Sequence, residues 1–364
     1  MDLRSQKISA KAFMYTVACF LMGSTLLTTI FSLIAGRDSW FIAVLGAALG
    51  LGFAFIYFKL QKAYPNLNLA ALNEKILGKP LGKAVSLAYL VFFITLAGLN
   101  AADVGDFITL NVLPQTPKLI ITAVFLGLCA FAVYRGLPVL TGYMQLFVFT
   151  GAIFLLTVFL LTLSKGSLNN LLPFFNQPLI KYIEGSHTAA CLPFGELIIF
   201  FALTPQVKEK ETVPKAFYAG YAMGFAAILF TSLLEIKTLG PLDPLLITPP
   251  FETLRIVTIN EVLSRLEIIF SAMFVMLFFA KVSLLYYVCL IMLGQIFNFN
   301  NLRSLILITG AFILFYSQNL WGSARQPLTE SLHQLPFIWS FFEVVLPGLT
   351  LIVCLIKQKR GHVQ

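Results

Sequence analysis

The sequence predicts an all-α membrane protein of ten transmembrane helices, built as a five-plus-five inverted repeat in which helices 1 and 6 are broken. Three observations predict this fold class. The chain of 364 residues is 59% hydrophobic and only 11% charged, whereas soluble domains carry about 25% charged residues. Ten apolar runs approach or exceed the roughly 20 residues that a helix needs to cross a bilayer. Two of these runs, five apart in order, are interrupted by residues that break helices.

The ten predicted spans match one another at an offset of five. The third and eighth are unusually long, the fourth and ninth unusually short, and the first and sixth interrupted. This pattern predicts one transmembrane domain over 1–364 with two repeats, about 9–163 and 184–357, and the odd offset requires the second to be inverted, a plan known from transporters. A chance match among ten spans is the alternative. The spans are about 9–35, 39–60, 82–110, 118–134, 138–163, 184–206, 214–236, 260–292, 302–318 and 336–357.

The basic residues predict the orientation of the chain. With the N-terminus inside, sixteen of the 25 Lys and Arg residues fall in inner segments and seven in outer ones. By the positive-inside rule both termini are therefore expected in the cytoplasm. Topology then explains the net charge of +9, and no nucleic-acid partner is expected. The five cysteines lie inside apolar runs without paired or metal-ligand spacing, which is typical of small core residues.

The first span is interrupted by Gly23, Ser24 and Thr25. A glycine lets a ligand approach the backbone, the two hydroxyls can hydrogen-bond to it, and the N-terminus of the following half-helix suits a carboxylate. Close helix packing at Gly23, with Ser24 and Thr25 bonded to their own backbone, is the alternative. The matching interruption in the sixth span favours a ligand site near the bilayer midplane.

Two kinds of segment outside the spans carry structural predictions. Residues 66–80 place Leu69, Leu72 and Ile76 on one helical face and end in Gly78 and Pro80. This pattern predicts a short amphipathic helix on the inner membrane surface. The outer loops 164–183, 237–259 and 319–335 are expected to be ordered caps.

The third span carries Asn100, Asp103 and Asp106 at helical spacing. Asn100 and Asp103 share a face, so they form a polar stripe near the outer end of this helix. The stripe has two interpretations: it lines an entry path, or the two carboxylates simply lie at the water boundary.

The sixth span is interrupted at Pro193, Phe194, Gly195 and Glu196. Pro193 removes a backbone donor and kinks the helix, and Gly195 loosens it further. Charges inside a membrane are costly and usually face the protein interior, where they pair or serve a pathway. Glu196 is thus expected either to pair with a cation that holds helices together, or to meet a ligand amine or a proton.

The eighth span carries Arg265, Glu267 and, near its middle, Lys281. Arg265 and Glu267 lie near the outer end and are expected to form salt bridges with neighbours. A buried lysine can replace a bound monovalent cation or take part in proton transfer. The alternative for Lys281 is snorkelling of its side chain to the inner interface.

Several activities lack their sequence signals. No phosphate-binding loop is present, and no set of His, Cys and carboxylate residues has the spacing of a metal site. No Ser-His-Asp arrangement has supporting context. We therefore expect neither an enzyme, nor a metal site, nor a cofactor.

Five segments together resemble one family. They are Met22 to Leu27, Ala35 to Trp40, Ile76 to Lys83, Phe194 to Glu196, and Arg265 to Glu267 followed by Phe278 to Ser283. In this order and spacing the chain resembles the B subunits of spore germinant receptors, which are spore germination permeases of the amino acid–polyamine–organocation transporter superfamily. The resemblance covers nearly the whole chain. It implies the LeuT-like inverted fold of that superfamily.

The resemblance also implies a role. It implies sensing of a small germinant such as an amino acid in the spore inner membrane, and assembly with a membrane-embedded A subunit and a lipoprotein C subunit. The resemblance further implies a ligand pocket among spans 1, 3, 6 and 8. Carried over by position, it comprises Gly23, Thr25, Phe92, Leu96, Glu196, Ile199, Ala280 and Lys281, to which the sequence itself adds Ser24, Asn100, Phe194 and Gly195.

Two functions are therefore weighed. The first is a receptor subunit that binds a germinant and passes a conformational bias to its partners. The alternative is a proton- or sodium-coupled amino acid transporter. A purely structural scaffold is a third possibility, and it would show no stabilisation by any germinant.

Overall fold

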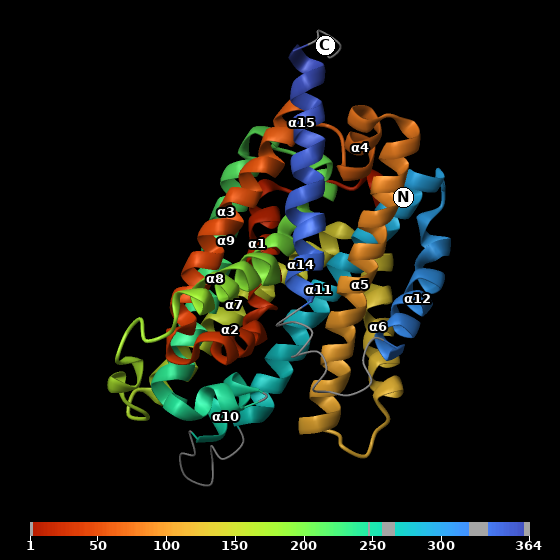
Figure 1. Ribbon diagram of the computed structural model, residues 1–364. Helices are drawn as coiled ribbons and strands as arrows, with labels where there is room; N and C mark the ends of the chain where they lie inside the picture. Colours follow the sequence, from red (N-terminus) through yellow and green to blue (C-terminus); the bar gives the residue numbers. More distant parts are fainter. Residues whose placement is uncertain (1–2, 247, 257–265, 320–333, 360–364) are drawn as a thin grey trace.

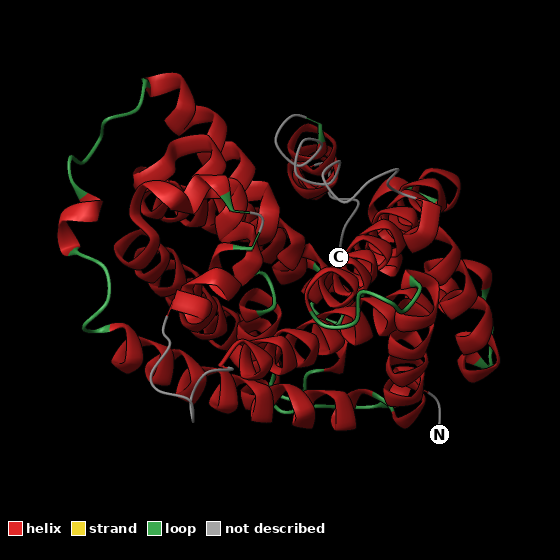
Figure 2. Cartoon of the chain, turned by 90° about the horizontal axis from the view of Figure 1, so that it is seen from below, coloured by secondary structure: helices red, strands yellow, loops and turns green. Residues whose placement is uncertain are grey.

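The computed structural model describes residues 3–246, 248–256, 266–319 and 334–359. Regular structure in these ranges is helical (Figures 1 and 2), apart from one isolated β-bridge between Ile8 and Val207. Arg265, the beginning of the predicted eighth span and most of the predicted cap 319–335 lie outside the described residues.

The first five predicted spans are present as helices. The first is α1 (Ala10–Met22) and α2 (Thr28–Ala35), joined by a short 3₁₀ segment (Thr25–Leu27). The next four are α3 (Ser39–Ala63), α5 (Lys79–Asn111), α6 (Lys118–Arg135) and α7 (Leu137–Thr162). The short α4 (Leu69–Leu77) lies between α3 and α5.

The second half has the matching order. Its first span is α8 (Leu179–Ala189), a π-helical segment (Ala190–Phe194) and a 3₁₀ segment (Gly195–Ala202). α9 (Val213–Leu239), α11 (Leu266–Phe297) and α12 (Ile306–Asn319) follow, with the short α10 (Pro249–Ile256) between α9 and α11. The last span is α14 (Leu335–Ser340), a π-helical segment (Phe341–Val345) and α15 (Leu346–Lys359).

Helix lengths follow the predicted pattern of long and short spans. Within the described residues, α5 and α11 have 33 and 32 residues, whereas α6 and α12 have 18 and 14. Eight helical stretches of the described chain are long and apolar enough to cross a membrane. One of them, Ala10–Ala63, contains the first two predicted spans, and α12 is shorter than these stretches. The helices therefore agree with the predicted spans in order and position.

A pair of glycines brings α1 against α9. Gly220 and Gly224 are four residues apart on α9, the spacing that lets helix backbones approach closely in membranes. A Cβ at Gly220 would meet the Met14 carbonyl and lie 2.8 Å from Val17 Cβ, and one at Gly224 would lie 2.8 Å from Leu21 Cδ1. No larger side chain fits between these helices, so α9 holds the half-helix that leads into the first break.

The two ends of the bundle carry different segments. Figure 1 shows α4 and the last turns of α15 at one end and α10 at the other. At the α10 end, the buried Asp38 carboxylate accepts from the backbone of Phe175 and Asn176 and from Tyr182, which orders the predicted cap 164–183. At the other end the Ile8 amide donates to Gln206 O at 2.9 Å, which ties the segment before α1 to the end of the sixth span.

The amphipathic helix is present, but its apolar face meets protein. Leu72 and Ile76 of α4 are buried in a cluster with Leu60 of α3 and Cys354 of α15. The Asn68 side chain caps the helix by accepting from Ala71 N at 2.9 Å. The predicted contact of this face with the membrane surface is therefore wrong: packing against α3 and α15 removes the same apolar area from water, and protein occupies the position expected for lipid.

Candidate ligand-binding site

Both predicted helix breaks are present. α1 ends at Met22, and Gly23 and Ser24 form a tight turn in which Ser24 N donates to Leu21 O at 2.9 Å. The sixth span leaves helical geometry at Leu192 (φ −115°, ψ 98°), directly before Pro193. These are the places where the sequence has residues that interrupt a helix. Backbone of both spans is therefore irregular inside the bundle.

Lys281 of α11 connects the two breaks. Its Nζ lies 2.7 Å from Glu196 Oε2 and donates to Ser24 Oγ at 2.7 Å. The ammonium also lies 4.9 Å from the centre of the Phe20 ring, a cation–π distance. Lys281 and Glu196 are only 2% and 3% exposed. Snorkelling of Lys281 to the inner interface is therefore excluded, and the ammonium neutralises the buried carboxylate.

A cavity lies beside this ion pair. Its empty space, counted together with the open solvent at its mouth, is about 560 Å³. It is bounded by both breaks, by α5, by α11 and by α14. Its polar groups are Ser24, Asn100, Asp103, Glu196 and Lys281. The remaining lining residues are Gly23, Leu26, Leu27, Leu96, Leu99, Leu192, Phe278, Leu335 and Trp339. A cavity with apolar walls and a small number of polar groups is typical of a site that binds a small molecule.

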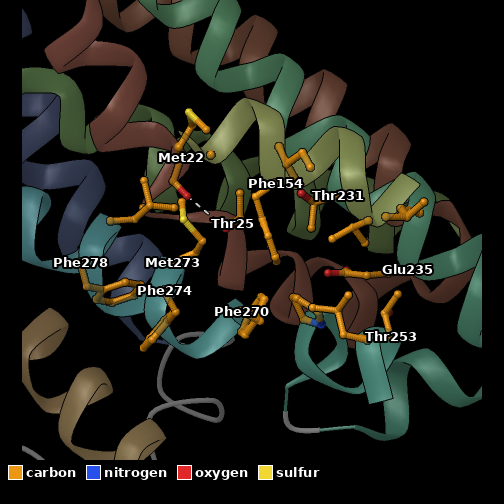
Figure 3. A pocket seen from close by; sticks show the side chains of 18 residues that line it. Met22, Thr25, Phe154, Thr231, Glu235, Thr253, Phe270, Met273, Phe274 and Phe278 are labelled. Atoms are coloured by element: carbon orange, nitrogen blue, oxygen red, sulfur yellow. Dashed lines mark hydrogen bonds between the residues drawn. The ribbon is translucent and has the colours of Figure 1, made fainter. Parts of the chain in front are cut away.

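Half of the sequence-predicted site residues line this cavity: Gly23, Ser24, Leu96, Asn100, Glu196 and Lys281. Thr25 instead lines a neighbouring cavity and donates to Met22 O at 3.1 Å (Figure 3).

The other five predicted residues lie behind the cavity wall. Phe92 stacks on Phe342 at 4.7 Å between ring centres, and Phe194 packs on Tyr221 at 5.3 Å. Ile199 and Ala280 are buried in the core. Gly195 faces the carboxylate of Glu343, which occupies the position that a Cβ would need. These residues shape the helices that form the wall and do not face the space.

The structure adds residues that the predicted site did not include. Asp103 belongs to the polar stripe of the third span, so its spacing from Asn100 was a usable signal. Glu343 is a carboxylate inside an apolar run, which was also a signal; it is fully buried against Gly195. Trp339 lines the cavity from α14. No sequence pattern distinguishes it from the other aromatic residues in the spans.

Solved structures of transporters share this fold. Mhp1, a nucleobase-cation-symport-1 family transporter with bromovinylhydantoin bound, matches with a TM-score of 0.68 at 11% identity, over 96% of this chain and 78% of that chain. MhsT in complex with L-phenylalanine matches with a TM-score of 0.67 at 14% identity, over 96% and 89%. At such identities the likeness shows the fold alone. It confirms the predicted LeuT-like architecture, and the protein is an integral membrane protein of that fold.

The sequence comparisons show the family. Residues 7–319 match the family described as spore germination protein. Spore germination protein KB of Bacillus subtilis (strain 168) is 27% identical over 366 residues, covering 98% of this chain and 97% of that protein. Spore germination protein GerQB of Bacillus cereus is 25% identical over 203 residues, covering 55% and 54%. The chain therefore belongs to the spore germination protein family, which confirms its resemblance to the B subunits of germinant receptors.

Proposed function

We propose that this chain is the germinant-sensing subunit of a spore germination receptor and that the cavity between its two helix breaks binds a small amino acid or a similar nutrient. The observation that carries the proposal is the contact of Lys281 with both Ser24 and Glu196 at the edge of a lined cavity. The contacts of this one charged side chain therefore depend on the relative position of the two broken helices.

The charges of the cavity suit a zwitterion. Glu196 is already paired with Lys281, so a ligand amine would not meet it without opening that pair. Asp103 lines the cavity, and none of the ion pairs formed by described residues involves it. We therefore assign the ligand ammonium to Asp103 and the ligand carboxylate to the turn at Gly23 and Ser24, next to the Lys281 ammonium.

Lys281 occupies the position of a cation between the first and eighth spans. A sodium ion bound there would compensate the Glu196 carboxylate and bind hydroxyl oxygens such as Ser24 Oγ. The ammonium makes both of these contacts. In this proposal Lys281 stands in for a coupling ion, so germinant binding needs no sodium.

Signalling follows from the same contacts. A ligand that binds one arrangement of the breaks better than another shifts the population toward it. We propose that a membrane-embedded A subunit and a lipoprotein C subunit respond to this shift in the spore inner membrane. Both termini of the chain would lie in the cytoplasm. The whole chain acts as one permease-like domain, since a single buried core includes residues from both halves.

Asp103→Asn is expected to weaken binding of the responsive amino acid by roughly tenfold to a hundredfold, because a charge-assisted hydrogen bond is lost. Asp106→Asn is the matched control, because Asp106 is three residues away and pairs with Lys118 at 2.7 Å. The measurement is the shift in Tm of the purified receptor complex across a panel of L-alanine, L-valine, L-leucine and L-phenylalanine. Equal binding by both variants would remove Asp103 from the site.

The transporter fold motivates one competing function, ion-coupled uptake of amino acids. Labelled amino acids added to vesicles that hold this chain alone distinguish the two. A receptor subunit is expected to show no accumulation with an imposed proton or sodium gradient. Accumulation driven by either gradient would favour the transporter.

A further inference from the structure

A second cavity lies next to the ligand cavity, on the side of α7, α9 and α10 (Figure 3). It shares Gly23 and Phe278 with the ligand cavity, and its empty space, counted together with the open solvent at its mouth, is about 700 Å³. Its walls are mostly apolar and include Met22, Phe154, Phe270, Met273 and Phe274. Such walls suit a hydrocarbon body more than a polar solute.

One carboxylate points into this apolar space. Glu235 of α9 is 2% exposed, and Figure 3 shows its carboxylate directed toward the interior of the cavity. Thr28 donates a hydrogen bond to its Oε1 at 3.2 Å. None of the ion pairs formed by described residues includes Glu235. An ionised carboxylate in such a place is costly unless a cation accompanies it.

Other polar groups around Glu235 also favour a cationic ligand with hydrogen-bond donors. The hydroxyls of Thr231 and Thr253 line the cavity and are buried without a hydrogen-bond partner in the described chain. A second buried carboxylate, that of Asp243, accepts from Ser32, one turn along α2 from the Thr28 that donates to Glu235. A ligand ammonium has several donors and one positive charge, so it satisfies both needs at once.

The cavity is adjacent to a groove that faces lipid. This groove between α7 and α9 is lined by Val148, Ala152, Leu156 and Met223, among others, and it shares Met22 and Leu155 with the cavity. Leu156 is 57% exposed on the surface of the spans. The surface that a hydrocarbon chain in the bilayer would contact is thus apolar, and two of its side chains also form the wall of the cavity.

We propose that this cavity binds a hydrophobic primary amine from the membrane. The ammonium pairs with Glu235 and donates to a threonine hydroxyl, and the hydrocarbon chain lies along the phenylalanine wall toward the groove between α7 and α9. This site uses a different carboxylate from the proposed germinant site but shares Gly23 with it, so that occupancy beside Gly23 would bias the first helix break.

The test uses the full chain in lipid nanodiscs and n-hexylamine as the probe. We expect n-hexylamine to raise Tm with saturation, after subtraction of its uptake by empty nanodiscs, whereas n-hexanol and hexanoate do not. Glu235→Gln is expected to weaken n-hexylamine binding roughly tenfold to a hundredfold. Asp103→Asn, which alters only the germinant cavity, is expected to leave it unchanged, so this proposal and the proposed function fail separately.

A second pair of variants tests the cavity if Glu235→Gln does not fold. Gly151 lines the cavity, and a Cβ there would lie 2.6 Å from the end of the Met22 side chain. Gly151→Leu should therefore fill the space and abolish the rise in Tm, while Gly142→Leu, at an open position of the same helix, should not. Equal stabilisation by n-hexanol would overturn the proposal, and so would unchanged n-hexylamine binding in Gly151→Leu. A rise in Tm that sodium chloride reproduces, but choline chloride does not, would also overturn it.

Discussion

Replacing Lys281 with methionine is expected to destabilise the protein by about 3–5 kcal/mol, because it leaves the buried Glu196 carboxylate without its cation. Methionine keeps most of the length and apolar volume of the lysine stem, so the loss comes mainly from the charge. The variant is also expected to abolish the germination response of spores, since the contact between the two helix breaks is lost. Thermal unfolding of the purified protein and a germination assay measure the two effects.

A double variant separates the structural part of this effect from the functional part. Lys281→Met combined with Glu196→Gln removes both charges, and it should recover most of the stability, as replaced buried ion pairs often do. The germination response should stay absent. Lys181→Met is the matched control: Lys181 pairs with Glu184 at 2.9 Å at a partly exposed position, where loss of the pair costs about 0–1 kcal/mol. A double variant that germinates normally would show that the ion pair only holds helices together.

Gly220→Val is expected to cost about 1–3 kcal/mol, the usual penalty for forcing extra methyl groups into a packed interface. The effect should lie toward the upper end, because the added Cβ meets the Met14 carbonyl, a backbone atom that cannot rotate away. α1 would have to move away from α9, and with it the turn at Gly23 and Ser24. Loss of stabilisation by the responsive amino acid should accompany the lower Tm.

The control for Gly220→Val is the same substitution at Gly142. Gly142 lies on α7, and nothing stands within 4 Å of the position that its Cβ would take. Valine has the same helix propensity at both sites, so a difference in Tm isolates the contact between α1 and α9. Equal Tm values for the two variants would contradict close packing at Gly220.

Much of the fold could be predicted because membrane insertion is decided by local composition. The long third span was predicted at 82–110 and is α5 (Lys79–Asn111); the sixth broke at Leu192 beside Pro193, as the missing backbone donor requires. The failure at α4 has a physical cause. An amphipathic pattern states that one face avoids water, and lipid and protein satisfy it equally well, so only the neighbours Leu60 and Cys354 showed which one covers it.

The candidate site was predictable in part for a similar reason. Gly23, Ser24, Glu196 and Lys281 are unusual residues for a lipid-facing helix, and each was singled out by its own type and position. Phe92, Phe194 and Ile199 are ordinary apolar residues, and the structure places them behind the wall. Asp103 and Trp339 line the cavity because α5 and α14 turn the faces that carry them toward the breaks.

The sequence by itself determined where the chain crosses the membrane and where two crossings break, since hydropathy and the loss of a backbone donor act within a few residues. Only the tertiary structure decided that Lys281 meets both breaks, that Glu235 points into an apolar cavity and that Asp103 remains without an ion pair among the described residues. Such partnerships depend on how far each helix is rotated about its axis. That rotation is set by many weak packing contacts between segments distant in sequence, and no local pattern encodes it.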